Sequence, residues 1–140
     1  MKNKIMYIMI LGVILMGLVG CSGGTNTTAQ ASLGQEFTLP YGKSVNISGE
    51  NLSIKFVAVV TDSRCPTGVQ CVWAGEAKVK LEVTQNNSTL ETVLTETGGT
   101  NGFSSGTINA YKVDFRVEPY PQANKTIAPE DYKLVMKITK

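Results

Sequence analysis

Hydrophobic and polar residues alternate along four separate segments of the chain. In residues 77–83, Val79, Leu81 and Val83 alternate with two lysines and a glutamate. The same alternation occurs at Ile54, Phe56, Ala58 and Val60, at Tyr111, Val113, Phe115 and Val117, and at Tyr132, Leu134, Met136 and Ile138. Because successive side chains of a strand point to opposite faces, this period of two predicts four half-buried β-strands.

Weaker strand patterns occupy residues 36–39, 44–48 and 90–96, and no segment has a helical period. Asn86-Asn87-Ser88 predicts a tight hairpin, whereas the glycine- and serine-rich residues 98–106 predict a long flexible connection. Pro129-Glu130-Asp131 predicts one turn of 3₁₀ helix before the last strand. About seven short strands with frequent turns predict an all-β domain. We expect an antiparallel β-sandwich, with a small β-barrel as the alternative.

The chain begins with a segment typical of an export signal. Lys2 and Lys4 precede an almost wholly apolar run over 5–19, which ends at Leu18-Val19-Gly20-Cys21. This ending resembles a lipobox, where prokaryotes attach lipid to the cysteine and cleave before it. The alternative is an uncleaved anchor, but the run is shorter than the ~20 residues that a membrane span needs. We therefore expect removal of residues 1–20 and lipidation of Cys21, on the outer face of a cell membrane or outer membrane.

Residues 21–35 predict a flexible tether after the lipidated cysteine, because 22–35 contain one large apolar residue among small and polar ones. A single domain over 36–140 would follow. Of the 13 basic residues, Lys2 and Lys4 lie in the leader, so the mature chain would carry eleven, equal to the 11 acidic residues. A neutral chain predicts no nucleic-acid partner. Membrane attachment would then depend on the lipid.

The two remaining cysteines, Cys65 and Cys71, form an even pair in an oxidising compartment and predict a disulfide. It would close a loop containing Pro66 and Gly68, with a gain of only about 2–2.5 kcal/mol from chain entropy. A zinc site would want more ligands, and the chain contains no histidine. A redox pair would want a closer Cys-x-x-Cys spacing. We expect no metal or other cofactor.

Four residues around this loop are candidates for binding, and each has a structural alternative. Asp62 and Arg64 could form an ion pair that braces the loop, or Arg64 could receive a partner's carboxylate. Trp73 is expected to pack in the core against the disulfide, with exposure to a ligand as the alternative. Glu76 follows Gly75, where a bulge could redirect it, and is otherwise expected to be solvated or structural.

The same segment resembles a family of small uncharacterised prokaryotic lipoproteins and secreted proteins. Their pattern is a Ser-Arg-Cys-Pro run, a second cysteine and then Trp-Ala-Gly. It corresponds here to Ser63, Arg64, Cys65, Pro66, Cys71, Trp73, Ala74 and Gly75. Pro119-Tyr120-Pro121 and the Pro129–Tyr132 approach to the last strand are also similar. The resemblance implies an all-β extracytoplasmic domain with a disulfide, and it implies no activity.

The absence of histidine removes the nucleophile systems that need it, and the acidic residues form no recognisable catalytic pair. We therefore expect no enzyme activity. The favoured function is a lipid-anchored binding or adaptor module for an envelope partner or ligand, with a contact surface at Arg64, the 65–71 loop and Tyr120. The alternative is inhibition of an extracytoplasmic protease, with the 65–71 loop entering the active-site cleft.

Overall fold

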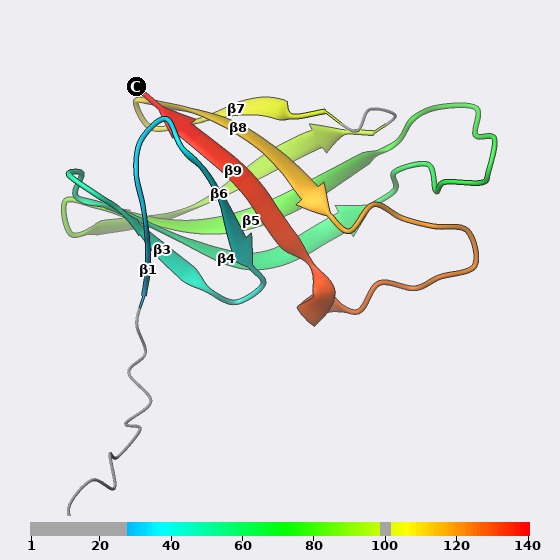
Figure 1. Cartoon of the computed structure of the whole chain (residues 1–140), viewed down its shortest axis with the longest axis horizontal. Coiled ribbons are helices and arrows are strands. Elements are labelled where there is room, and N and C mark those ends of the chain that lie inside the picture. Colours follow the sequence, from blue (N-terminus) through cyan, green and yellow to red (C-terminus); the bar gives the residue numbers. More distant parts are fainter. Residues whose placement is uncertain (1–27, 99–101) are drawn as a thin grey trace, which may run out of the picture.

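The computed structural model describes residues 28–98 and 102–140, and these residues form two β-sheets packed face to face (Figure 1). The first sheet has the order β1 (Ala29–Ala31), β3 (Ser44–Ile47), β4 (Leu52–Asp62), β5 (Glu76–Gln85) and β6 (Ser88–Thr97). The second has the order β2 (Glu36–Pro40), β9 (Lys133–Thr139), β8 (Tyr111–Glu118) and β7 (Ser104–Ile108). The predicted β-sandwich is confirmed. Both sheets are open, so the barrel alternative is wrong.

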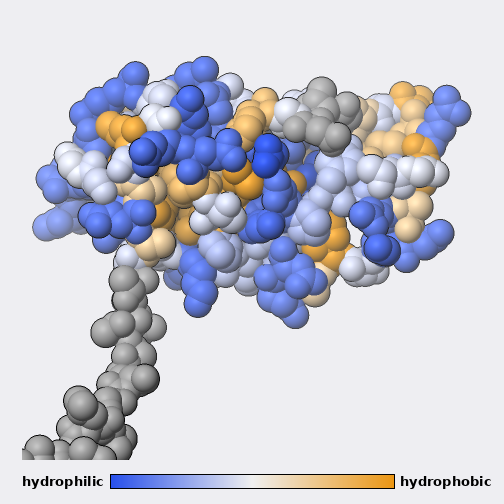
Figure 2. Space-filling model, viewed as in Figure 1, coloured by the Kyte–Doolittle hydropathy of each residue, from blue (hydrophilic) through white to orange (hydrophobic). Residues whose placement is uncertain are grey.

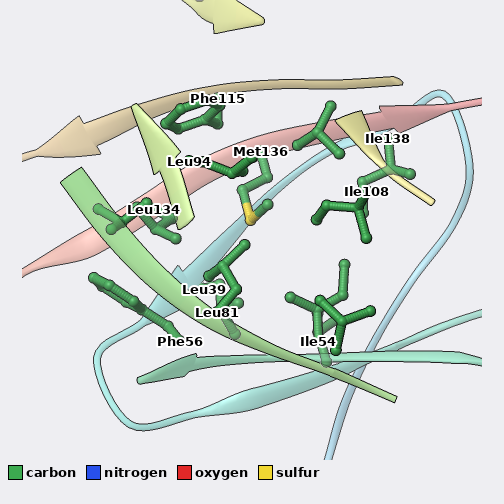
Figure 3. Packing of buried hydrophobic residues seen from close by; sticks show 14 of the residues in the cluster. Leu39, Ile54, Phe56, Leu81, Leu94, Ile108, Phe115, Leu134, Met136 and Ile138 are labelled. Atoms are coloured by element: carbon green, nitrogen blue, oxygen red, sulfur yellow. The ribbon is translucent and has the colours of Figure 1, made fainter. Parts of the chain in front are cut away.

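The core lies between the sheets and is built from the alternating apolar positions (Figure 3). The inward faces of β5 and β8 are buried as predicted, and so are Leu134, Met136 and Ile138 of β9. The large side chains that fill the layer are Phe56, Leu81, Phe115, Leu134 and Met136, together with Leu39, Ile54, Ile108 and Ile138. Their burial is the main favourable term in forming the sandwich.

The prediction for β4 is correct only in its first half. Leu52, Ile54 and Phe56 face the core, but Ala58 pairs with the outward-facing Lys80, and the side chain of Val60 is 51% exposed. The pairing register between β4 and β5 shifts by one residue at Val57 and again at Val60. Because one extra residue moves the following side chains to the opposite face, the expected core positions at Ala58 and Val60 are wrong.

Two predicted local features are confirmed. Asn86 and Asn87 form the two-residue turn between β5 and β6, both with positive φ, as tight hairpins of this length favour. Residues Pro129–Asp131 form the 3₁₀ helix η1, which leads into β9.

Two segments predicted to be flexible contain strands within the described residues. β1 (Ala29–Ala31) lies in the predicted tether. There β1 pairs in parallel with β3, Ala31 is buried, and the Gly34 N–H donates to the Ile138 carbonyl. Likewise β7 occupies the end of the predicted 98–106 connection, because Ser104–Ile108 pairs with β8 and Ile108 is buried. Both segments are strands because a neighbouring strand pairs with each of them, and neither has a strong hydrophobic pattern of its own.

The loop between β4 and β5 lies at one end of the sandwich, and β1 lies at the other (Figure 1). In the part of the chain that the structure describes, no helix is long and apolar enough to cross a membrane. The predicted leader over 1–20 and Cys21 lie outside the described residues.

Candidate binding site at the disulfide loop

Residues 63–75, here called the disulfide loop, connect β4 to β5 and contain the predicted disulfide. The Cys65 and Cys71 sulfurs are 2.10 Å apart, and their Cα atoms are 6.0 Å apart. The bridge joins residues only six apart in sequence, so it restricts the shape of the loop rather than the path of the whole chain.

Backbone hydrogen bonds extend the β4–β5 ladder into the base of this loop. The Ser63 N–H donates to the Glu76 carbonyl, and the Cys65 N–H donates to the Ala74 carbonyl, each at 2.8 Å. The Gly98 N–H also donates to the Gly75 carbonyl at 2.8 Å. Gly75 has a φ of +72°, a conformation that favours glycine. The base of the loop is therefore fixed from both sides.

A second set of bonds ties the loop to the segment between β8 and η1. The Thr67 N–H donates to the Pro121 carbonyl at 2.9 Å, and the Ala123 N–H donates to the Thr67 carbonyl at 3.1 Å. Both backbone groups of Thr67 thus have partners within the chain. The Val69 N–H donates to the Pro66 carbonyl and closes a turn at the tip.

Arg64 is buried beneath the loop, and all five N–H groups of its guanidinium donate hydrogen bonds. The Nε and Nη2 groups bind the two oxygens of Asp62, at 2.9 and 2.7 Å. Nη1 binds Glu96 Oε2 at 3.2 Å and the Val117 carbonyl at 2.6 Å, and Nη2 also binds the Pro119 carbonyl at 3.1 Å. The prediction of an Asp62–Arg64 pair bracing the loop is confirmed.

This burial overturns the alternative in which Arg64 receives a carboxylate from a partner. Its side chain has no exposed surface, and every donor is already used. Its role is positional. It joins the start of the disulfide loop, which follows the first sheet, to the Val117 and Pro119 carbonyls at the end of β8 in the second sheet.

Sequence reasoning missed Glu96, the buried carboxylate of this cluster. Its Oε2 accepts hydrogen bonds from Arg64 Nη1 and, at 3.0 Å, from the Val117 N–H. The available signal was its position in β6, because Glu96 is in phase with the inward-facing Leu94. A charged residue in phase with core positions indicates a buried partner, but the sequence does not say which one.

The net pKa shifts of Asp62 and Glu96 have opposite signs, although burial and Arg64 act on both carboxylates. Burial raises the pKa of Asp62, but the hydrogen bonds and positive charge of Arg64 outweigh it, so this pKa lies below 3.8. Burial also raises the pKa of Glu96, and the opposing effects of Arg64 and the Val117 N–H leave that pKa above 4.5. Burial and the Asp62 hydrogen bond raise the pKa of Tyr132 to about 12. The Tyr132 hydroxyl therefore stays protonated and donates to Asp62 Oδ2 at 3.0 Å.

The preferred prediction for Trp73, packing in the core, is wrong. Its side chain is 77% exposed, Val72 beside it is 98% exposed, and Val69 is also exposed. The two-residue spacing from Cys71 placed Trp73 on a strand face, but this segment is a loop and not a strand. Hydrophobic surface is visible at the end of the molecule that carries this loop (Figure 2).

The remaining two candidates lie at the margins of the loop. Glu76 begins β5 and forms an exposed ion pair with Lys78 at 2.7 Å, which fits the solvated alternative. The centroid of the Tyr120 ring lies 5.1 Å from the guanidinium carbon of Arg64, which stacks over the ring. Tyr120 also lines a hollow of about 240 Å³ with Pro119, Gln122 and Ile127.

The described residues contain no group of three or more histidine, cysteine, aspartate or glutamate side chains that could hold a metal ion. The chain matches no protein-family model, no curated protein and no solved structure. The resemblance to small prokaryotic lipoproteins therefore stays a prediction, and the local geometry is the basis for any assignment of function.

Proposed function

We propose that this protein is a lipid-anchored, extracytoplasmic binding module that presents the disulfide loop to a protein of the cell envelope. The observation that carries the proposal is the exposure of Trp73 and Val72 on a loop whose base is held rigidly. An exposed tryptophan is the kind of residue that dominates binding energy at protein interfaces. A loop already fixed by Arg64 and by a disulfide loses little conformational entropy on docking.

The chemistry of the loop indicates the character of the partner. Residues 66–75 contain no charged side chain, so long-range electrostatic attraction contributes little at this surface. Val69, Val72 and Trp73 instead offer apolar area, and an apolar pocket on the partner would remove it from water. The hollow beside Tyr120 lies in the segment that Thr67 ties to the loop, and it offers a recess, lined also by Lys125 and Asp131, for a side chain of the partner.

The proposal is for binding without catalysis. Among the described residues, Glu96 is the only buried carboxylate, and it shares Arg64 with the part-buried Asp62. Burial together with the bonds to Arg64 accounts for the shifted pKa values of both carboxylates, which fits a structural role.

Lipid anchoring at Cys21 is the second part of the proposal, and it has its own test. Labelled fatty acid supplied to the host should become attached to the wild-type protein. Cys21→Ser should carry no label and should leave the membrane fraction. Equal labelling of both proteins would contradict anchoring at this cysteine.

Crosslinking in the host tests the binding surface. A photo-reactive amino acid replaces Val72, and the matched control places it at Val93, whose side chain is 50% exposed on the outer face of β6. We expect a discrete protein adduct from position 72, lost when Trp73→Ala is added, and no such adduct from position 93. Adducts with lipid alone would indicate that the loop enters the bilayer, and identical adducts from both positions would indicate non-specific contact. Either result would overturn the proposal.

Protease inhibition is a second candidate because residues 67–71 are exposed within the disulfide-closed loop. The internal bonds of Thr67 count against it, since a substrate-like segment offers its backbone groups to the protease. The full chain should be assayed against trypsin-, elastase- and subtilisin-type proteases. Inhibition that survives Trp73→Ala but is lost on changing Val69 would favour the inhibitor over the adaptor.

A further inference from the structure

A groove lies between the second half of β4 and η1. β3 pairs with β4 only from Leu52 to Lys55, and one more pair of hydrogen bonds joins Phe56 to the Gly42-Lys43 turn. Beyond that point, no strand in the described part of the chain pairs with β4 on the side away from β5. Residues 57–62 therefore form a strand edge, although β4 occupies the middle of the sheet order.

A hollow of about 350 Å³ follows this edge. Its lining includes Val59, which packs against the core, and Val60, which is 51% exposed. The other lining residues are Tyr41, Ala58, Thr61, Asp62, Pro129 and Tyr132. The hydrogen bond from Tyr132 to Asp62 fixes one of the two tyrosine rings, and an edge-on contact of Tyr41 with Phe56, with ring centroids 5.7 Å apart, fixes the other.

A strand edge beside a hollow of mixed lining, with Val59, Tyr41 and Pro129 as its apolar part, matches one kind of ligand. Edge backbone groups bond to another extended chain, and a hollow beside them accepts alternate side chains of that chain. We propose that this groove binds an extended peptide segment of a partner protein. The segment adds as a short strand along residues 57–61 and places an apolar side chain between Val59, Tyr41 and Pro129.

The irregularity of β4 favours a short peptide over a second copy of the same edge. Both register shifts, at Val57 and Val60, fall within the exposed edge. Such bulges twist a strand and interrupt regular pairing, which blunts an edge against long edge-to-edge association. A short segment along residues 57–61 does not need such a long regular ladder.

This site is distinct from the apolar tip of the disulfide loop, so each can be tested without the other. The probe is a random-peptide library displayed on phage, panned against the full chain immobilised in detergent. Enriched peptides are synthesised, their affinities are measured by calorimetry, and their footprints are mapped by backbone amide NMR shifts. The test variant is Val60→Lys. The matched control is Val93→Lys, because the two valines are almost equally exposed, at 51% and 50%.

We expect enriched peptides with apolar residues at alternate positions and amide shifts centred on residues 57–62. Val60→Lys should weaken binding about tenfold or more, whereas Val93→Lys and Trp73→Ala should leave it unchanged. Near-ultraviolet circular dichroism of each variant should match the wild type. Failure to enrich any peptide over the uncoated surface would overturn the proposal. Equal binding to Val60→Lys, or shifts confined to the disulfide loop, would also overturn it.

Discussion

The guanidinium of Arg64 and the carboxylate of Glu96 meet at 3.2 Å inside the sandwich, although 32 residues separate them in sequence. Arg64 follows β4 and Glu96 lies in β6, so the pair spans β5. The bonds from Arg64 to the Val117 and Pro119 carbonyls reach the second sheet. One buried cation therefore connects both sheets at the end of the molecule where Trp73 is exposed.

Removal of Arg64 should destabilise the fold strongly. Arg64→Ala leaves the buried Glu96 and the part-buried Asp62 without their cation, and breaking a buried ion pair costs about 3–5 kcal/mol. Arg116→Ala is the matched control, because the Arg116–Glu118 pair is partly exposed and such pairs contribute about 1 kcal/mol or less. Urea denaturation of both variants measures the difference. Similar losses for the two would argue against a special role for the buried cluster.

Replacement of Glu96 should change how stability depends on pH. Because the folded pKa of Glu96 lies above 4.5, the folded chain holds this proton after the unfolded chain has released it. Stability from this group is therefore greatest below pH 4.5 and is lost as pH rises through the folded pKa. The free energy of unfolding of the wild type minus that of Glu96→Gln should therefore decrease as the pH rises from 4.5 toward neutrality.

Asp62 has the opposite trend, with stability lost as pH falls below 3.8 toward its folded pKa, so this comparison stays above pH 4.5. Glu91→Gln, at an exposed ion pair with Lys80, is the control for removing a surface carboxylate. The same pH dependence for Glu96→Gln and Glu91→Gln would refute the raised pKa of Glu96.

Glycine at position 75 should be indispensable for the base of the disulfide loop. A Cβ at Gly75 would overlap the Ser63 carbonyl and carry the strain of a φ of +72°. Gly42 has almost the same φ, +71°, but nothing lies within 4 Å of a Cβ there. Gly42→Ala should cost about 1–2 kcal/mol from backbone strain alone, and Gly75→Ala clearly more. Thermal unfolding of the two variants measures this difference. Equal losses of stability would show that the base of the loop can shift to accommodate the added Cβ.

Trp73 should contribute almost nothing to stability. Substitutions at exposed sites usually change the free energy of unfolding by less than about 0.5 kcal/mol, and we expect this of Trp73→Ala. Trp73 is also the only tryptophan in the chain, so intrinsic fluorescence reports its surroundings directly. Strong quenching by iodide in the folded state is expected. Protection from iodide, together with a large loss of stability on substitution, would place the indole in a core.

Loss of the disulfide should alter the loop more than the fold. The chain-entropy model gives about 2–2.5 kcal/mol for a closed loop of this length, so Cys65→Ser with Cys71→Ser should remain folded at reduced stability. If the loop is the docking surface, the double variant should lose most of its partner crosslinking from position 72 under conditions in which it is still folded. Retention of full crosslinking without the bridge would show that hydrogen bonds alone hold the loop.

The sequence was sufficient where each residue's environment follows from strand periodicity. The alternation in β5 and β8 fixed which side chains face the core, and the asparagine pair at 86–87 fixed a hairpin with positive φ. The cysteine pair and the closely spaced Asp62 and Arg64 also indicated their own partners. Each of these features depends on residues that are near one another in the chain.

Tertiary structure decided the features that depend on distant partners. Val57 and Val60 become bulges only against β5, so periodicity placed Ala58 and Val60 on the wrong face. β1 and β7 are strands because neighbouring strands pair with them, and their own patterns are weak. Glu96 meets Arg64 only after β4, β5 and β6 align, and Trp73 is exposed because its segment leaves the sheet. Local pattern specifies local conformation, whereas burial and ion pairing depend on which elements the folded chain brings together.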